Sequence, residues 1–126
     1  MKRPSRREID KRLKEAKEAL QKNQVYFANF SKTYRELENL EIGETFEIWD
    51  LILKLLDEIK VQNYTGQYPP KLNTEPCGVG SELWAFHWNS RILGKEMYLK
   101  FSIKDSFFYY VSLHASTFPR ENGEKK

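Results

Sequence analysis

Polar and apolar residues alternate along three runs in the last third of the chain, at 82–88, 97–103 and 108–114. Side chains on a β-strand point to opposite faces with a period of two, so these runs predict three strands with one buried face each. Turn residues separate the runs, and we expect an antiparallel meander over residues 81–118. The phase expected in the core is Met97, Leu99, Phe101, Ile103, Tyr109, Val111 and Leu113. The opposite face would carry Tyr98, Lys100, Ser102, Tyr110, Ser112 and His114.

The first half of the chain shows helical spacing instead. Apolar residues at Ile9, Leu13, Ala16 and Leu20 recur every three or four positions, which predicts an amphipathic helix within residues 1–22. Further patterns predict an edge strand at 24–30, a short helix at 33–40 and the longest helix at 46–60. The broad apolar stripe of the longest helix indicates that it packs against the sheet.

Residues 63–80 contain three prolines and three glycines, which predicts a long loop rather than a helix or strand. Loops of this length inside a compact domain are usually functional or mobile. The order of the elements predicts a single α+β domain over residues 1–126. Its N-terminal helices would pack on a small, mainly antiparallel sheet of about four strands.

Length and composition narrow the class of protein. A chain of 126 residues with 40% hydrophobic and 31% charged residues is typical of one globular domain. No apolar run approaches the ~20 residues that span a bilayer, and the N-terminus lacks the apolar segment of a secretory signal. The single cysteine, Cys77, excludes an internal disulfide. We therefore expect a cytoplasmic protein that has no membrane partner.

Positive charge is concentrated at the N-terminus. The net charge is +3 overall, but residues 1–22 hold nine Lys or Arg against four acidic residues, a net charge of +5. Such a segment suits an anionic partner, with nucleic acid first among the candidates. The candidate RNA contacts in this segment are Arg6, Arg7, Lys11 and Arg12. A solvated helix with i,i+4 pairs such as Glu8/Arg12 and Asp10/Lys14 would explain the same charges.

Several kinds of site are missing from the sequence. The only histidines, His87 and His114, are on different predicted strands, and no H-x-x-x-H or C-x-x-C spacing occurs. The chain has no phosphate-binding P-loop, no dinucleotide-binding glycine pattern and no G-x-S-x-G motif. We therefore expect neither a metal site nor a cofactor.

Phosphate chemistry without a metal must use side chains. Cleavage of RNA needs a base for the ribose 2′-OH proton, an acid for the leaving oxygen, and a cation for the charge on the phosphorus oxygens. Tyr98, Lys100 and His114 on the polar face can supply all three roles. A structural interpretation is also open, in which Tyr98 and Tyr110 form an ordinary cross-strand aromatic pair and the other two are surface residues.

Five segments of the chain share their order and spacing with one known family. They are Asn63-Tyr64-Thr65-Gly66, Leu83-Trp84-Ala85-Phe86, Gly94-Lys95-Glu96-Met97-Tyr98-Leu99-Lys100, Val111-Ser112-Leu113-His114-Ala115 and Phe118-Pro119. Together they resemble the MqsR-type toxins of bacterial type II toxin–antitoxin systems, which are RelE-like mRNA interferases. The resemblance extends over roughly residues 17–119, and its most specific part is Gly-Lys-x-x-Tyr-x-Lys followed by Val-Ser-x-His.

The resemblance implies a RelE-like fold, endoribonuclease activity on mRNA, alone or on the ribosome, and neutralisation by a cognate antitoxin encoded nearby. It places Tyr98 at the family's catalytic tyrosine and Lys100 at the lysine two positions on. His114 falls where MqsR has a lysine and many relatives have histidine. The chain departs from the pattern at Thr65, which replaces a basic residue, and at His87-Trp88. Whether Thr65 or His87 belongs to the site stays open.

Further RNA contacts are expected around these residues. They are Arg91 and Lys95, in the first connection of the meander, and Tyr110 and Ser112, on the polar face. The expected products are a 2′,3′-cyclic or 3′-phosphate and a 5′-hydroxyl end. Two other functional classes remain open. One is a non-catalytic nucleic-acid-binding module that uses the basic helix and the aromatic sheet face, and the other is a protein-interaction domain that uses a helix and the long loop.

Overall fold

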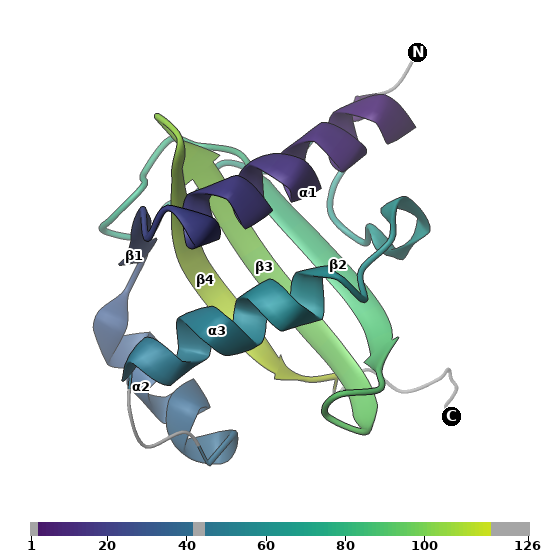
Figure 1. The fold of residues 1–126 in the computed structure, drawn as a ribbon. Helices are drawn as coiled ribbons and strands as arrows, with labels where there is room; N and C mark the ends of the chain where they lie inside the picture. The colour runs from purple at the N-terminus through teal and green to yellow at the C-terminus, as the bar shows by residue number, and fades with distance from the viewer. Residues whose placement is uncertain (1–2, 42–44, 117–126) are drawn as a thin grey trace, which may run out of the picture.

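The computed structural model describes residues 3–41 and 45–116 of the chain. These residues form three α-helices and a four-stranded sheet, arranged as in Figure 1, so the expected α+β class is confirmed. The elements are α1 Arg6–Gln21, β1 Val25–Phe27, α2 Phe30–Asn39, α3 Thr45–Leu56, a 3-10 turn Val61–Asn63, β2 Leu83–Ser90, β3 Lys95–Lys104 and β4 Phe107–Ala115. None of the helices in this described part has the length and apolar run that crossing a membrane requires.

The four strands form one mixed sheet in the order β1-β4-β3-β2. The antiparallel meander of β2, β3 and β4 is confirmed. β1 lies at the sheet edge, as expected, and pairs in parallel with the first half of β4, from Val25 opposite Phe108 to Phe27 opposite Tyr110. Because β1 ends there, the second half of β4 has no neighbouring strand on that side among the described residues.

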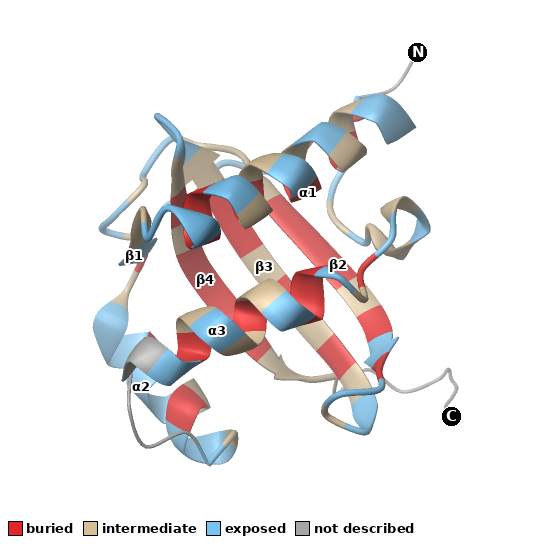
Figure 2. Cartoon of the chain, viewed as in Figure 1, coloured by how far each residue is buried: buried red, intermediate tan, exposed pale blue. Residues whose placement is uncertain are grey.

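One face of the sheet is covered by α1 and α3, which lie across it (Figure 1). The strands beneath them are buried along much of their length (Figure 2). The apolar stripe predicted for α1 is confirmed, because Ile9, Leu13 and Ala16 are buried. The largest fully buried side chains are Trp84, Tyr110, Phe86, Phe101, Phe108, Ile48, Ile52, Leu55, Leu56, Met97, Leu99 and Leu113. The core therefore lies between these helices and this face of the sheet.

The predicted boundaries agree with the structure to within a few residues. α3 ends at Leu56 rather than at residue 60. α2 begins at Phe30 rather than at residue 33, because the side chain of Asn29 accepts a hydrogen bond from the Lys32 amide at 3.3 Å and caps the helix there. The long loop before β2 is confirmed. Residues 117–118 of the predicted meander and the Phe118-Pro119 segment lie outside the described residues.

One part of the predicted strand phase is wrong. β4 contains a β-bulge, because Lys100 pairs with Ser112 whereas Phe101 pairs with Tyr110, so Val111 has no partner. One extra residue in a strand shifts the side chains beyond it to the other face. Tyr110, which was expected on the polar face, is therefore fully buried in the core. Tyr109, which was expected in the core, stacks on the exposed Tyr26 instead.

Candidate active site

The face of the sheet opposite α1 and α3, which we call the second face, carries the candidate catalytic residues. In the strand register, Tyr98 of β3 lies between His87 of β2 and His114 of β4. Lys100 lies two residues further along β3, on the same face. The structure thus brings Tyr98, Lys100 and His114 together, and it adds His87 to the same row.

The imidazole of His114 has a defined orientation. Its ring stacks on that of Tyr98, with ring centroids 5.1 Å apart and planes inclined by 26°. Its Nδ1 lies 2.9 Å from the carbonyl oxygen of Ala115. Because a carbonyl oxygen can only accept a hydrogen bond, Nδ1 carries the proton in this contact, and Nε2 holds the lone pair of the neutral ring. His114 is therefore oriented to accept a proton at Nε2.

Tyr98 and Lys100 are half-buried, and burial shifts the pKa of each. Loss of solvation raises the pKa of the Tyr98 phenol, which therefore keeps its proton at neutral pH. Burial and the nearby charge of Lys32 lower the pKa of Lys100, and Glu75 counteracts this shift. A poorly solvated ammonium gains more from a nearby anion than one in bulk water. This part of the face therefore offers a proton donor and a cation suited to an anionic ligand.

His87 and Thr65, whose roles the sequence left open, both lie close to these residues. Nε2 of His87 pairs with Oε1 of Glu96 at 3.0 Å, and a carboxylate in this position orients the ring beside Tyr98. Thr65 lines the same cavity as Tyr98 and Lys100. Neither position could be inferred from spacing, since the two residues belong to a different strand and to the long loop.

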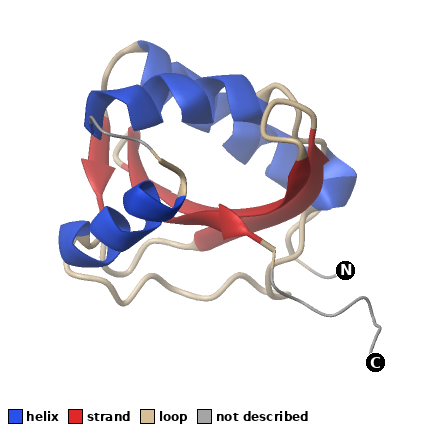
Figure 3. Cartoon of the chain, turned by 90° about the horizontal axis from the view of Figure 1, so that it is seen from below, coloured by secondary structure: helices blue, strands red, loops and turns tan. Residues whose placement is uncertain are grey.

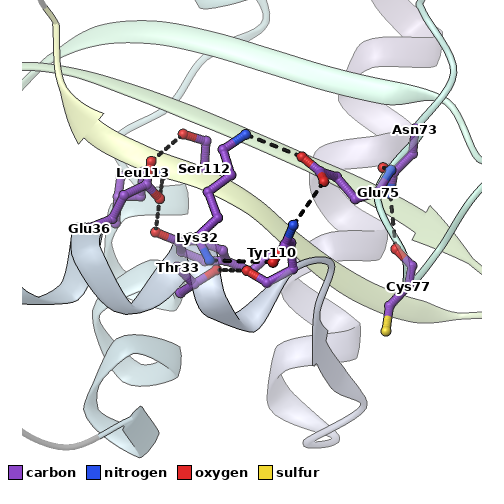
Figure 4. Close-up of polar contacts among 10 residues, drawn as sticks. Lys32, Thr33, Glu36, Asn73, Glu75, Cys77, Tyr110, Ser112 and Leu113 are labelled. Carbon is purple, nitrogen blue, oxygen red and sulfur yellow. Dashed lines mark hydrogen bonds and ion pairs between the residues drawn. The ribbon is translucent and has the colours of Figure 1, made fainter.

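A carboxylate that sequence analysis missed holds the neighbouring part of β4. Glu36 of α2 accepts hydrogen bonds from the hydroxyls of Tyr110 and Ser112, both at 2.6 Å, and from the Leu113 amide at 3.1 Å (Figure 4). Ser112 and Leu113 lie beyond Tyr110, the last residue of β4 that pairs with β1, so a side chain takes the place of a strand there. No local pattern indicates this contact, because even Tyr110 is 74 positions away from Glu36.

Two expected RNA contacts are corrected by this network. Tyr110 and Ser112 are both buried, and both hydroxyls are bound to Glu36. Burial and the adjacent carboxylate raise the pKa of Tyr110, so its phenol stays protonated. The β-bulge is the physical reason that neither hydroxyl is free, because it turns Tyr110 inward while leaving Ser112 within reach of the same carboxylate. Neither residue is retained as an RNA contact.

The long loop before β2 crosses the second face and reaches α2. Figure 3 shows this loop on one side of the sheet and the long helices on the other. Asn73 is buried, and its side-chain amide donates to Ser102 Oγ at 3.2 Å. Glu75 accepts a hydrogen bond from Asn29 and pairs with Lys32, both at 3.2 Å, at the start of α2 (Figure 4). The loop is therefore tied to both the sheet and α2.

The basic residues of α1 lie apart from the candidate site. Arg6, Arg7 and Lys11 are exposed on α1, which covers the opposite face of the sheet (Figure 2). Arg12 is ion-paired with Glu15, and its guanidinium also lies over the Trp84 ring. The structure does not bring these residues together with Tyr98, and RNA binding by α1 stays a prediction.

Arg91 and Lys95 flank the turn between β2 and β3, and they differ in position. Glu58 fixes the turn by accepting hydrogen bonds from Trp88 Nε1 and the Arg91 amide, both at 2.9 Å. Desolvation opposes the charge on Glu58, but these and two further hydrogen bonds together lower its pKa. The Arg91 side chain lies beside the end of α3, whereas Lys95 lines a cavity of about 350 Å³ together with His114. Only Lys95 is placed near the candidate site.

The two members of the stacked Tyr98–His114 pair line different cavities. Tyr98 and Lys100 line one of about 180 Å³ beside the long loop, and His114 lines the one of about 350 Å³ beside α2. Within residues 3–41 and 45–116, no group of three or more His, Cys, Asp or Glu side chains is arranged to hold a metal ion. Comparison of the chain with models of known families, with curated proteins and with solved structures found no match.

Proposed function

We propose that the chain is a RelE-like endoribonuclease that acts in the cytoplasm as an mRNA interferase of the MqsR type. The observation that carries this proposal is the stacked Tyr98–His114 pair with Lys100 on the same face. A basic nitrogen, a protonated phenol and a cation are the three groups that RNA cleavage requires. The sequence resemblance around these residues supports the same assignment. Helices packed on one face of a mainly antiparallel sheet are compatible with a RelE-like fold.

In the proposed reaction, His114 Nε2 takes the proton of a ribose 2′-OH, and the 2′-oxygen attacks the adjacent phosphorus. The bond from phosphorus to the 5′-oxygen of the next nucleotide breaks, and Tyr98 gives its phenolic proton to that oxygen. Lys100 stabilises the charge that grows on the non-bridging oxygens. The products are a 2′,3′-cyclic phosphate and a 5′-hydroxyl end. Return of the proton from His114 to Tyr98 through water restores both groups.

Single substitutions test the three roles. His114→Ala should lower turnover by roughly 10²–10⁴, the range of one positioned acid–base group, and leave RNA binding nearly intact. Tyr98→Phe should cause a similar loss because it removes only the hydroxyl. Lys100→Ala should slow cleavage and also weaken binding, because a cation acts on bound RNA and on the transition state. Matched controls are Tyr34→Phe on the exposed side of α2 and Lys104→Ala at the end of β3, which should cleave at the wild-type rate.

Two results would refute the proposed site. Wild-type rates in both His114→Ala and Tyr98→Phe would show that these side chains do not transfer protons. Because side chains supply the base, the acid and the cation, cleavage should also persist in excess EDTA. Complete loss of cleavage in EDTA that Mg²⁺ or Mn²⁺ restores would contradict this mechanism.

A cell that makes such an enzyme must restrain it, so we also propose that the chain is the toxin of a type II system with a cognate antitoxin encoded nearby. Expression from a tight promoter should stop growth and degrade bulk mRNA, alone or on ribosomes. Co-expression of the adjacent small gene should restore growth. A folded chain that is harmless when abundant would contradict the toxin assignment, and RNA binding without cleavage would favour a non-catalytic binding module.

A further inference from the structure

The long loop forms an arch, residues 66–70, over the edge of the second face. The chain leaves the sheet at Thr65, whose amide donates to the Ala85 carbonyl at 2.9 Å. It returns at Lys71, whose carbonyl accepts a hydrogen bond from the Leu83 amide at 2.7 Å. Both anchors lie on β2, two residues apart. The arch therefore has fixed ends next to the strand that borders Tyr98 and Lys100.

Contacts with Tyr64, just before the arch, hold the shape of the arch. The Tyr64 hydroxyl donates to the Gln67 carbonyl oxygen at 2.6 Å, and its ring makes an edge contact with Tyr68 at 5.3 Å between centroids. Gly66 lies so close to the Tyr64 ring that a Cβ there would come within 2.6 Å of the hydroxyl oxygen. A loop that is already ordered loses little entropy when it binds a ligand. The arch is therefore suited to form one preordered side of a binding site.

The charged side chains that line the cavity of about 180 Å³ between the arch and the sheet are all positive. Leu83 and Ala85 give it an apolar floor. Lys71 and Lys100 supply two ammonium groups, and Thr65 and Gln67 supply a hydroxyl and an amide; among the described residues that line the cavity, none carries a carboxylate. Neither ammonium is ion-paired within the described part of the chain. Such a lining suits a ligand with a flat apolar ring and a negative charge.

The volume limits the size of that ligand. An enclosed apolar cavity of roughly 150 Å³ takes up one benzene molecule, whereas sites for drug-sized ligands have about 300–1,000 Å³. The cavity is therefore of a size for one planar base and too small for two stacked bases. Tyr98 and Lys100 border it, so a ring bound there would lie next to the groups that the proposed reaction uses.

We propose that this cavity is the subsite for one nucleotide of the RNA substrate, with the base under the arch and its phosphate between Lys71 and Lys100. This inference rests on the proposed function for the choice of RNA as the polymer. The Gln67 amide has one donor and one acceptor group, the pair that reads the edge of a base by hydrogen bonding. Gln67 is therefore the residue that sets the base preference at this position. The apolar floor favours a base over an acidic peptide side chain as the ligand.

Binding of single nucleotides tests the subsite without any cleavage. The probes are the four 3′-nucleoside monophosphates and inorganic phosphate, titrated into the whole chain by calorimetry and by NMR. We expect one nucleotide to bind more tightly than the other three and all four to bind more tightly than phosphate. Lys71→Ala should weaken nucleotide binding about tenfold, as expected for one charge-assisted hydrogen bond. Gln67→Ala should reduce the difference between bases and leave phosphate binding unchanged.

Matched controls separate the subsite from general effects of charge. Lys54→Ala on α3 and Gln62→Ala in the 3-10 turn change exposed residues outside this cavity, and they should leave nucleotide affinity unchanged. Lys71 and Gln67 are themselves exposed, so their substitution leaves the core intact. Circular dichroism verifies that each variant is folded.

The results distinguish the subsite from the proposed function. Equal affinity for all nucleotides and for phosphate, or affinities that Lys71→Ala and Gln67→Ala leave unchanged, would overturn the subsite even if the chain cleaves RNA. Cleavage whose sequence preference is the same in Gln67→Ala and wild type would also overturn it. Base-selective binding that depends on Gln67 and Lys71 would support the subsite even if no RNA is cleaved, and the proposed function would then fail alone.

Discussion

Substitution of Glu36 tests how the free edge of β4 is held. Glu36→Ala removes one acceptor from three donors, the Tyr110 and Ser112 hydroxyls and the Leu113 amide. A hydrogen bond to a charged group contributes about 1.5–3 kcal/mol. The sum of three such hydrogen bonds overstates the loss of stability, because Glu36 is only half-buried and water can replace part of the hydrogen bonding that it provides. We expect the free energy of unfolding to fall by about 3–4 kcal/mol, a large part of the roughly 5–15 kcal/mol of a typical domain.

Two further variants separate the charge from the shape of Glu36 and control for the helix. Glu36→Gln keeps one accepting oxygen but points an NH₂ group at a donor, so we expect a loss of about 1–2 kcal/mol. Glu38→Ala makes the same change on the exposed side of α2, two residues away. It should change the free energy of unfolding by less than about 0.5 kcal/mol.

Urea unfolding followed by circular dichroism measures these free energies. Amide hydrogen exchange measures the local effect, because the Leu113 amide donates to Glu36 and should exchange much faster in Glu36→Ala. The Leu99 amide, in the middle of the sheet, should change only as far as global stability does. If Leu113 stays as protected as in the wild type and stability changes by less than about 0.5 kcal/mol, the carboxylate does not hold this edge.

Two other predictions follow from contacts of the loop and the turn. Gly66→Ala should displace the Tyr64 hydroxyl from the Gln67 carbonyl and lower the free energy of unfolding by about 1 kcal/mol. The loss should be smaller in a Tyr64→Phe background, which already lacks the hydroxyl. Additive losses in this double-mutant cycle would contradict the contact. The pKa of Glu58 is lowered in the folded state, so the unfolded chain binds more protons and stability should fall as pH drops below the ordinary value of 4.5. Glu58→Gln should make urea unfolding less sensitive to pH in this range, and an unchanged sensitivity would exclude Glu58 as a source.

Local periodicity was enough to predict much of the fold. The alternation of Met97, Leu99 and Phe101 set the buried face of β3, and with it the position of Tyr98 and Lys100 on the second face. Stripes of apolar residues set α1 and α3, and the prolines and glycines of 63–80 set the loop. These features depend on neighbouring residues in the chain, which a sequence displays directly.

The remaining features depend on contacts between distant segments. The bulge at Val111 shifts half of β4 to the other face, and no residue type in that strand marks it. Glu36 has an ordinary place in a polar helix, and its role arises only because β1 stops at Phe27. The arch joins loop residues to β2 through backbone hydrogen bonds, which any residue except proline can donate. Sequence alone therefore could not place Gln67 beside Tyr98.

The parallel pairing of β1 with β4 has a consequence for synthesis on the ribosome. β1 and the two long helices are made early, but their partners in the sheet are made late. Until β4 has left the ribosome, Val25–Phe27 has no strand to pair with and α1 has no complete sheet to cover. Tyr98 and His114 likewise meet only when β3 and β4 pair. The chain therefore gains its core and its candidate site in one late step, and a nascent chain that still lacks β4 has neither.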